Sequence, residues 1–336
     1  MNKLTNCIIN KDFSCRPVWF MRQAGRYLPE FKEIRSKNKN FIKLCLNSDL
    51  SSKITLQPIQ RFNLDAAIIF SDILMVPYAL GQEVDFVEDL GPRLSSFDIK
   101  NFLNQKEKDF IFKLKTIYES IKRTRASLSK EKSLISFIGS PWTLIVYMFG
   151  LKNEKNILNL DKLNKKRDEI DLTLKKLNNF LCIHIKNQIE YGADVVQLFD
   201  SWAGLIPEEN LSEYCYEPNL RIVDFCKKNK IPAICFPKGI KKNYANFMRI
   251  VKPDCISIDY DVDPIWIRKN LTDVCIQGGM DPRILLQEEE HFYREAEKYL
   301  KVFKDCPYIF NLGHGILPET KVENVEKLIK FVKEYK

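Results

Sequence analysis

The chain has 336 residues, of which 45% are hydrophobic and 29% are charged, and its formal net charge is +9. This composition is far from that of a disordered chain and is sufficient for one large core. The apolar runs are strand-sized, well short of the roughly 20 residues that a membrane-spanning helix needs. Residues 1–14 lack the apolar run of a secretory signal peptide. We therefore expect a cytoplasmic protein that does not enter a membrane.

Lysine and arginine, 53 in all, outnumber the 44 aspartate and glutamate residues. The basic residues are spread along the chain and interleaved with acids, whereas nucleic-acid-binding proteins tend to cluster them among aromatic residues. We therefore expect a solvated basic surface with no nucleic-acid partner, which is compatible with a polyanionic small-molecule substrate. A basic nucleic-acid-binding module is the alternative from another functional class, and salt-sensitive affinity for DNA or RNA would reveal it.

The ten cysteines are all more than four residues apart, so the sequence has no paired-cysteine motif for zinc or redox chemistry. It also has no HExxH motif, no GxGxxG loop and no GxxxxGK[ST] loop. These observations predict an enzyme or binding protein with no metal and no cofactor. In a chain without a secretory signal, we expect the thiols to be reduced.

Eight short apolar runs recur along the chain, and amphipathic stretches lie between them. The runs are residues 18–21, 66–70, 134–138, 195–199, 232–236, 256–258, 274–277 and 308–312. This alternation predicts an α/β fold, a (β/α)8 barrel of parallel strands with its active-site cleft at their C-terminal ends. Because no linker or repeat interrupts the pattern, we expect residues 1–336 to form one domain. The long interval 72–134 leaves room for an extra hairpin near residues 83–87.

Two helices have recognisable ends. One apolar stripe at helical spacing precedes Gly192, a plausible helix stop; it consists of Ile170, Leu174, Leu177, Leu181, Ile185 and Ile189. Near the C-terminus, Thr320 and Glu323 form a capping-box pattern ahead of another apolar stripe. The pattern predicts that Thr320 caps the last helix.

In such a barrel, the polar residues that follow the runs are expected to face one shared cavity. They are Arg22, Gln23, Arg26, Asp72, Pro141, Trp142, Asp200, Ser201, Lys238, Asp259, Asp281 and His314.

Arg22 and Arg26 are four residues apart, and two neighbouring guanidinium groups make most sense when they face anions. Arginine grips a carboxylate through two parallel hydrogen bonds. The alternative is a solvent-facing pair that interacts with Glu30 and Glu33. Asp72 is a lone acid between apolar residues, and burying its charge there without a partner costs free energy. It is either a carboxylate held for cationic or N–H-rich ligand atoms, or a structural acid.

His314 lies between two glycines beyond the last run, and we expect its side chain to point into the cavity. His184 is expected to be a packing residue and His291 a solvated one. Tyr147 is either a core residue or a ligand contact, and Ser201 either contacts a ligand or caps a helix. A triad of Ser201 and His314 is disfavoured because the sequence has no GxSxG elbow.

Taken together, several segments resemble the uroporphyrinogen decarboxylase family nearly end to end. In chain order they are PVWFMRQAGRYLPEF, TLQPIQRFNLDAAIIFSDIL, FIGSPWTLIVYMFG, QLFDSWAG, SIDYDVD, QGGMDP and FNLGHGILPET. Two residues depart from the family pattern. Gly279 stands where we expect Asn, which should affect a turn, and Pro237 makes the loop of Lys238 less certain.

The resemblance implies a homodimeric (β/α)8 barrel of tetrapyrrole and heme biosynthesis. It implies a carboxy-lyase that converts the four acetate side chains of uroporphyrinogen III stepwise to methyls, giving coproporphyrinogen III, without metal or cofactor. Carried over by motif, the residues that contact this polycarboxylate substrate are Arg22, Gln23, Ala24, Gly25, Arg26, Asp72, Tyr147, Ser201 and His314. Among them, Asp72 and Arg22 are the implied catalytic residues.

A rival within the same superfamily is the zinc- and corrinoid-dependent methyltransferase. Such an enzyme would need a His-x-Cys motif near the fifth strand and a further cysteine near the eighth. Here Ala233 stands two residues before Cys235, and His314, not a cysteine, follows the last run. The sequence therefore favours the decarboxylase over the methyltransferase.

Overall fold

The computed structural model describes residues 2–87 and 91–335. Its main sheet has seven parallel strands in the order β1-β4-β5-β6-β7-β8-β9. These are β1 (Ala66–Ile68), β4 (Ser133–Gly139), β5 (Val195–Asp200), β6 (Ala233–Pro237), β7 (Cys255–Ile258), β8 (Cys275–Gly278) and β9 (Tyr308–Ile309). Seven of the eight predicted runs therefore form strands of one parallel sheet, as expected.

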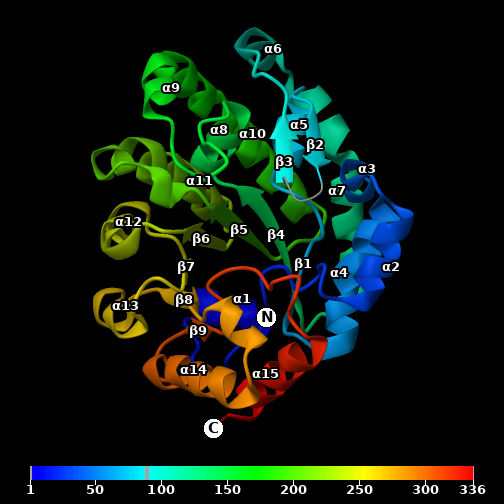
Figure 1. Cartoon of the computed structure of the whole chain (residues 1–336), viewed down its shortest axis with the longest axis vertical. Coiled ribbons are helices and arrows are strands. Elements are labelled where there is room, and N and C mark those ends of the chain that lie inside the picture. Colours follow the sequence, from blue (N-terminus) through cyan, green and yellow to red (C-terminus); the bar gives the residue numbers. More distant parts are fainter. Residues whose placement is uncertain (1, 88–90, 336) are drawn as a thin grey trace.

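The sheet curls around a central axis, and helices lie along its outer side (Figure 1). The first predicted run, residues 18–21, is not a strand. It makes one parallel bridge, between Val18 and Phe310. The main chain of this segment is also hydrogen-bonded on both sides: Phe310 N donates to Pro17 O at 2.9 Å, and Asp65 N donates to Val18 O at 2.9 Å. The segment thus lies between β9 and β1, although it is too short and too irregular to count as a strand.

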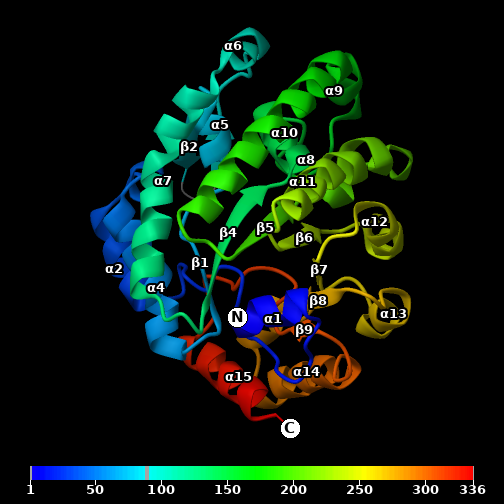
Figure 2. The same ribbon diagram turned by 180° about the vertical axis from the view of Figure 1, so that it is seen from behind.

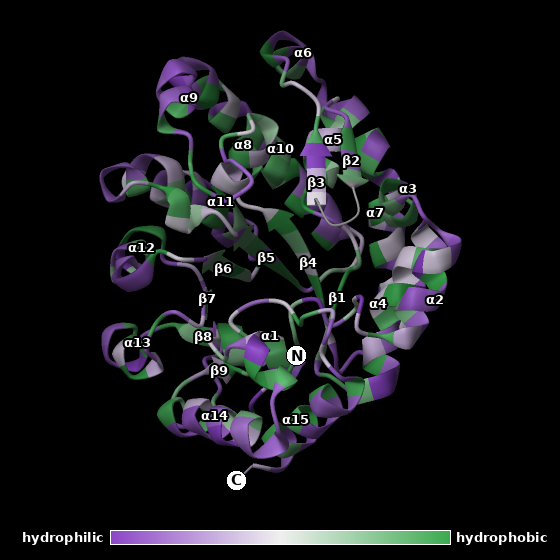
Figure 3. Ribbon diagram, in the orientation of Figure 1, coloured by the Kyte–Doolittle hydropathy of each residue, from purple (hydrophilic) through white to green (hydrophobic). Residues whose placement is uncertain are grey.

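Helices alternate with the strands along the chain, and most of them lie on the outer side of the sheet. They are α1 (Lys3–Ile9), α2 (Pro29–Lys37), α3 (Phe41–Cys45), α4 (Ser48–Phe62), α5 (Met75–Ala79), α6 (Ile99–Asn104), α7 (Glu107–Ser127), α8 (Pro141–Met148), α9 (Leu160–Lys165), α10 (Arg167–Glu190), α11 (Glu217–Lys228), α12 (Tyr244–Val251), α13 (Pro264–Asn270), α14 (Glu289–Val302) and α15 (Val322–Glu334). In Figure 3 the helices alternate between hydrophilic and hydrophobic residues, whereas the strands are mainly hydrophobic. No helix in the described ranges is long and apolar enough to span a bilayer.

The predicted hairpin is confirmed: β2 (Val84–Val87) and β3 (Gly91–Leu94) pair antiparallel in a separate two-stranded sheet. The stripe at residues 170–189 is also confirmed as a helix, α10, and Gly192 follows its end with a φ of 111°. The predicted cap of the last helix is wrong. Helix α15 begins at Val322 with Lys321 as its N-cap, so Thr320 lies one residue too early to cap it.

The inside of the curled sheet is lined by alternate residues of each strand, as the register requires. Ile135 pairs with Val195, for example, and both face the interior. Helix α1 lies across the centre of the sheet (Figure 2). Its residues Leu4, Cys7 and Ile8 pack into this interior cluster. The helix therefore fills one end of the interior, and the loops at the C-terminal ends of the strands surround the other end.

Above the apolar layer, the interior contains a hydrogen-bonded polar layer. The indole Nε1 of Trp19 donates to Gln277 Oε1 at 2.9 Å. Gln277 Nε2 in turn donates to Gln197 Oε1 at 3.0 Å and to Ser257 Oγ at 3.2 Å. All four side chains are fully buried. Because these bonds cross between strands, they fix the strands relative to one another beneath the C-terminal loops.

Candidate active site

The turn after residues 18–21 holds Arg22 in an unusual backbone conformation. Arg22 has a φ of 60°, the left-handed region that residues other than glycine seldom adopt. The next residue, Gln23, is fully buried, and its amide is used within the fold. Its Oε1 accepts from Phe20 N at 3.0 Å, and its Nε2 donates to Ala66 O at 3.0 Å. Gln23 therefore ties the turn to β1 rather than facing the cavity, in contrast to our expectation.

A second buried amide joins this turn to the segment that carries His314. Asn311 Oδ1 accepts from Met21 N at 3.1 Å and from Leu312 N at 2.7 Å. A methyl group at Gly315 would overlap the Arg22 side chain, so only glycine allows this close approach. Arg22 is thus positioned from both sides by groups that are distant in sequence.

Asp72 follows β1 and is half-buried. Its Oδ1 accepts from Leu74 N at 2.8 Å. Burial raises the pKa of Asp72 to about 6, while the Leu74 N–H and the positive charge of Arg22 oppose that rise. At neutral pH the carboxyl is therefore mainly ionised, and most of its acceptor capacity is not used by the protein.

Arg22 combines an exposed side chain with a pKa that burial lowers below its usual value. A group that keeps accessible area and is also surrounded by protein atoms lies in a concave region. The nearby charges of Asp72 and Tyr147 oppose the lowering, and that of Arg26 adds to it. The structure thus brings Arg22, Arg26, Asp72 and Tyr147 into one electrostatic cluster.

The alternative in which the arginines interact with Glu30 and Glu33 is wrong, because the two acids have other partners. Glu30 forms a two-bond ion pair with Arg61, at 2.8 and 3.0 Å. Glu33 pairs with Lys37 on the same helix at 2.8 Å. Arg26 is exposed and has no ion pair among the residues that the structure describes. Its charge is therefore available to a ligand.

Tyr147 projects from α8 and is half-buried. Its ring meets Trp202 edge-on, with the ring centroids 6.0 Å apart. Burial raises the pKa of Tyr147, and the charge of Asp72 acts in the same direction. The neighbouring Trp142, which was expected to face the cavity, is a core residue instead: it is fully buried, and its Nε1 donates to Trp202 O at 3.0 Å.

His314 is half-buried beyond β9. Burial, together with the positive charges of Arg22 and Lys238, lowers its pKa to about 4, so the imidazole is neutral at pH 7. Its Nδ1 accepts from Gly315 N at 2.8 Å. The ring proton is therefore assigned to Nε2, which becomes a hydrogen-bond donor.

Ser201, directly after β5, is half-buried. The following helical turn starts without a side-chain cap, so Ser201 is not the predicted alternative, a helix cap. The other two histidines are as expected. His184 is buried, with Tyr118 Oη at 3.0 Å from its Nδ1, and burial lowers its pKa to about 3. His291 is exposed.

Three predicted cavity residues serve the fold instead. Asp200 is 1% exposed and accepts from Thr143 Oγ1 at 2.8 Å and from Asn219 Nδ2 at 3.2 Å. Burial raises its pKa to about 6, against these bonds. Asp259 is fully buried and bonded to Gly239 N, and Asp281 caps a helical turn. Sequence position after a strand cannot distinguish such acids from Asp72, because their partners come from other elements.

Sequence analysis missed two aromatic residues. Phe137 on β4 and Phe199 on β5 face the interior, are only partly buried, and meet edge-on with centroids 5.7 Å apart. Because helices cover the outer side of these strands, the exposed parts of both rings face the interior near the strand ends. They form an apolar surface inside the sheet near the C-terminal ends of β4 and β5. Finding them required the strand register, which the sequence does not contain.

The two residues that depart from the family pattern, Gly279 and Pro237, affect the backbone and not the charged cluster. Gly279 has a φ of 105°, and a Cβ there would overlap the Tyr299 ring, so this backbone position favours glycine. Pro237 ends β6 and pairs with Asp200. The following residue, Lys238, is half-buried and close enough to His314 to lower its pKa.

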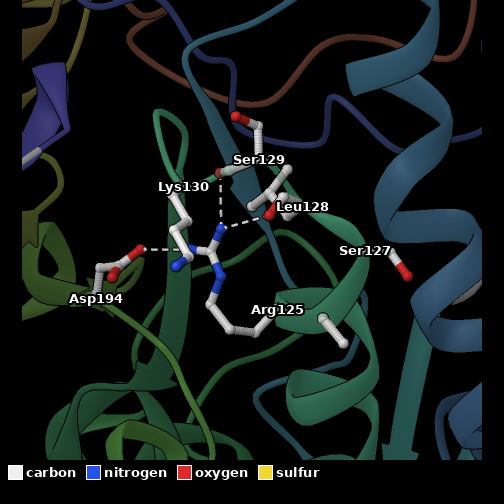
Figure 4. Close-up of a pocket in the computed structure, with 7 residues that line it drawn as sticks. Arg125, Ser127, Leu128, Ser129, Lys130 and Asp194 are labelled. Carbon is white, nitrogen blue, oxygen red and sulfur yellow. Dashed lines mark hydrogen bonds and ion pairs between the residues drawn. The ribbon is translucent and has the colours of Figure 1, made fainter.

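A hollow lies at the other end of the molecule from the residues described above, and the residues that line it serve the fold. It is lined by residues 125–130 and Asp194 (Figure 4). The guanidinium of Arg125 lines it and bonds Asp194 Oδ2 at 3.0 Å and the carbonyl oxygens of Leu128 and Ser129 at 2.8 and 2.7 Å. Its cation is therefore already satisfied. Elsewhere in residues 2–87 and 91–335, no three His, Cys, Asp or Glu side chains gather as a metal site would require.

Comparison with known proteins agrees with the sequence motifs. A family model described as Uroporphyrinogen decarboxylase (URO-D) matches residues 1–335. The chain belongs to the uroporphyrinogen decarboxylase family. A uroporphyrinogen decarboxylase of Rickettsia felis is 44% identical over 327 residues, covering 95% of this chain and 93% of the relative. One of Rickettsia bellii is 43% identical over 331 residues, covering 95% of both chains.

Solved structures share the fold of this family member at low sequence identity. A methyltransferase from Methanosarcina mazei superposes with a TM-score of 0.76 at 15% identity, covering 99% of this chain and 97% of the other. A B12-independent methionine synthase from Shewanella gives a TM-score of 0.52 at 14% identity, covering 85% of each chain. These likenesses establish a common α/β architecture and carry no argument about activity.

Proposed function

We propose that this chain is a uroporphyrinogen decarboxylase, a carboxy-lyase that converts the four acetate side chains of uroporphyrinogen III to methyls. The observation that carries the proposal is Asp72. The residue is half-buried, and its carboxylate accepts from Leu74 N at 2.8 Å and interacts electrostatically with Arg22, while the Phe137 and Phe199 rings offer an apolar surface inside the same sheet. Such a group suits a flat apolar macrocycle with N–H donors at its centre and carboxylates at its edge.

The substrate carboxylates would meet an excess of positive charge. Arg22 and Arg26 would each hold a carboxylate through paired hydrogen bonds, with Ala24 and Gly25 allowing the backbone of this turn to approach the substrate. His314 supports the proposal because its neutral ring presents Nε2–H, a donor to a carboxylate oxygen. The hydroxyls of Tyr147 and Ser201 complete the set of contacts. Gln23 would act by positioning the turn.

The reaction needs an electron sink, because loss of CO2 leaves an electron pair on the acetate methylene. Protonation of the pyrrole α carbon next to the carbon that bears the acetate makes a ring cation, in which the acetate-bearing carbon is electron-deficient. The C–CO2 bond then breaks, its electron pair forms an exocyclic double bond, and CO2 leaves. Protonation of the exocyclic carbon and loss of the ring proton give the methyl group. The net change is one proton taken up for each CO2 released, so the substrate's own ring supplies the sink that a cofactor would otherwise supply.

Asp72 would act on this path by its charge. It would accept pyrrole N–H bonds in the ground state and oppose the ring cation as that cation develops. Arg22 would hold the reacting or a neighbouring carboxylate. We assign no residue as the proton donor: an arginine seldom gives up its proton, which argues against Arg22 in that role even though burial lowers its pKa.

We also propose that the curled sheet closes as an eight-stranded barrel forming one domain, with residues 17–19 as the eighth strand. The two flanking main-chain bonds of this segment support closure, both at 2.9 Å. The proposed setting is the heme pathway in the cytoplasm, with a homodimer as the functional unit. The ten free cysteines support a reducing compartment.

The decisive experiment uses the pure, metal-stripped chain with uroporphyrinogen III under reducing, anaerobic conditions. Chromatography of the products should show hepta-, hexa-, penta- and then tetracarboxylate species, ending at coproporphyrinogen III. Unchanged octacarboxylate after prolonged incubation would refute the proposed function. Turnover that appears only after zinc is restored would favour the methyltransferase-like alternative.

A further inference from the structure

A tight hairpin links α8 to α9 at the edge of the site. Lys152 and Leu158 form an antiparallel bridge. Asn159 N donates to Leu151 O at 2.7 Å, and Asn153 N donates to Ile157 O at 3.1 Å. Lys152 therefore lies at the base of the hairpin, where the backbone is held on both sides, and not at its exposed tip.

The Lys152 ammonium lies against the two aromatic rings of the site. Its Nζ is 4.5 Å from the centroid of the Trp202 ring and 6.0 Å from that of Tyr147. Such contacts attract a cation to the ring face and restrict a flexible side chain. Tyr147 in turn interacts with Asp72 and Arg22. Lys152 is therefore separated from the centre of the charged cluster by one aromatic ring.

The charge of Lys152 is not neutralised within the protein. Its Nζ donates to the neutral amide of Asn156, at 2.7 Å from Oδ1. No carboxylate in the described part of the chain lies within ion-pair distance of it. Lys166, by contrast, contacts Glu169 at 2.6 Å. A positioned cation without a carboxylate partner in the described residues, at the edge of a carboxylate-binding site, is available to an external anion.

We propose that Lys152 is a further specificity-determining residue that binds a peripheral carboxylate of the porphyrinogen. This inference rests on the proposed function. The macrocycle projects its carboxylates outward, so a cation beyond the Tyr147 ring would meet one that Arg22 and Arg26 cannot reach. The simpler interpretation is a lysine that only rests on Trp202, and it predicts no effect on substrate affinity.

Substitution of Lys152 by methionine tests the proposal, because methionine keeps the apolar length and removes the charge. Lys155→Met is the matched control, since Lys155 lies in the same hairpin and is exposed. For uroporphyrinogen III, we expect Lys152→Met to raise KM by about 3- to 30-fold, as for loss of a partly solvated ionic contact, with kcat within about twofold. Lys152→Arg should restore most of the affinity, and Lys155→Met should match wild type.

Two results would overturn the proposal. One is a KM for Lys152→Met within about twofold of that for Lys155→Met. The other is a KM rise that occurs with a lower melting temperature and that Lys152→Arg does not correct, which would indicate a structural contact to Trp202. If the wild-type chain fails to decarboxylate, the proposed function fails. The binding of uroporphyrin, followed by tryptophan fluorescence in the same variants, then decides whether Lys152 binds a carboxylate.

Discussion

Asp72 and Asp200 are two acids near the C-terminal ends of β1 and β5 in the same parallel sheet, and burial raises the pKa of each to about 6. Their hydrogen bonds differ. The two oxygens of Asp200 are bonded to Thr143 and Asn219, and its side chain has almost no exposed area. In the described residues, the hydrogen-bond partner of Asp72 is the backbone N–H of Leu74; the residue is half-buried, and its charge interacts with that of Arg22.

A raised pKa does not by itself mark a functional acid. Burial raises the pKa of both carboxyl groups to about 6. A carboxylate can bind a ligand, however, only through oxygen lone pairs that the protein has not already bonded. Asp200 joins β5, α8 and α11 and serves the fold. Asp72 is held at one oxygen and open at the other, which is the arrangement that N–H donors of a substrate require.

The largest effect is expected for Asp72→Asn. The amide can still accept from Leu74 N and from some pyrrole N–H groups, but it lacks the negative charge that opposes the ring cation. An interaction made mainly in the transition state lowers kcat more than binding, and we expect a loss of about 10²–10³-fold. Steady-state kinetics with uroporphyrinogen III measures this.

The same variant should melt at or above the wild-type temperature. The pKa of Asp72 is raised in the folded state, so above that pKa its ionised form opposes folding, and Asn removes this cost. Near wild-type turnover with an unchanged melt would make Asp72 a structural acid like Asp200.

Arg26→Ala should weaken substrate binding next most strongly. One of several carboxylate contacts is lost, and hydrogen bonds to charged groups contribute about 1.5–3 kcal/mol, so KM should rise by roughly 10–150-fold. The fold should be unaffected because Arg26 is exposed and bonded to no acid in the described residues. An unchanged KM, where KM reports binding, would remove Arg26 from the site.

The acid limb of the pH profile of kcat/KM should show which of the two aspartates must be ionised for activity. As pH falls through about 6, Asp72 becomes protonated and its charge is lost, so kcat/KM should fall below that pH by about tenfold per unit. His314, with a pKa of about 4, stays neutral through this range. The limb should persist in Asp200→Asn and disappear in Asp72→Asn. If the limb were lost in Asp200→Asn instead, it would report the titration of Asp200, and its assignment to Asp72 would be wrong.

Asp200→Ala should destabilise the protein with little effect on chemistry. The buried donors of Thr143 and Asn219 lose their acceptor, which costs about 1–3 kcal/mol in the free energy of unfolding. Urea unfolding would measure the loss, and kcat at a temperature where the variant is folded should stay within about threefold of wild type. A hundredfold loss of kcat with a normal melt would give Asp200 a role in the reaction.

The smallest effect is expected on exhaustive chelation, because neither acid belongs to a recognisable metal-ligand motif. Turnover after treatment with a strong chelator should equal that of the untreated protein. A loss of activity that added zinc restores would contradict the proposed cofactor-free reaction.

Local sequence patterns were sufficient to predict many of the strands and helices of this protein. Apolar runs of strand length and stripes of helical spacing predicted the alternation of strands and helices, because these periods follow from backbone geometry. The motif around residues 17–31 also predicted the family and the arginine cluster. The Thr320 cap failed because the start of a helix depends on one residue's backbone dihedrals, which the pattern does not fix.

Tertiary structure decided what each polar residue can do. Asp72, Asp200 and Asp259 look alike from the sequence, since each follows an apolar run. They differ because Thr143, Asn219 and Gly239 come from other elements and use the acceptors of the last two. Long-range packing likewise turned Gln23 inward, exposed the Phe137 and Phe199 rings to the interior, and set Lys152 against Trp202. Hydrogen-bond satisfaction is a property of neighbours in space, and the sequence by itself determines only neighbours along the chain.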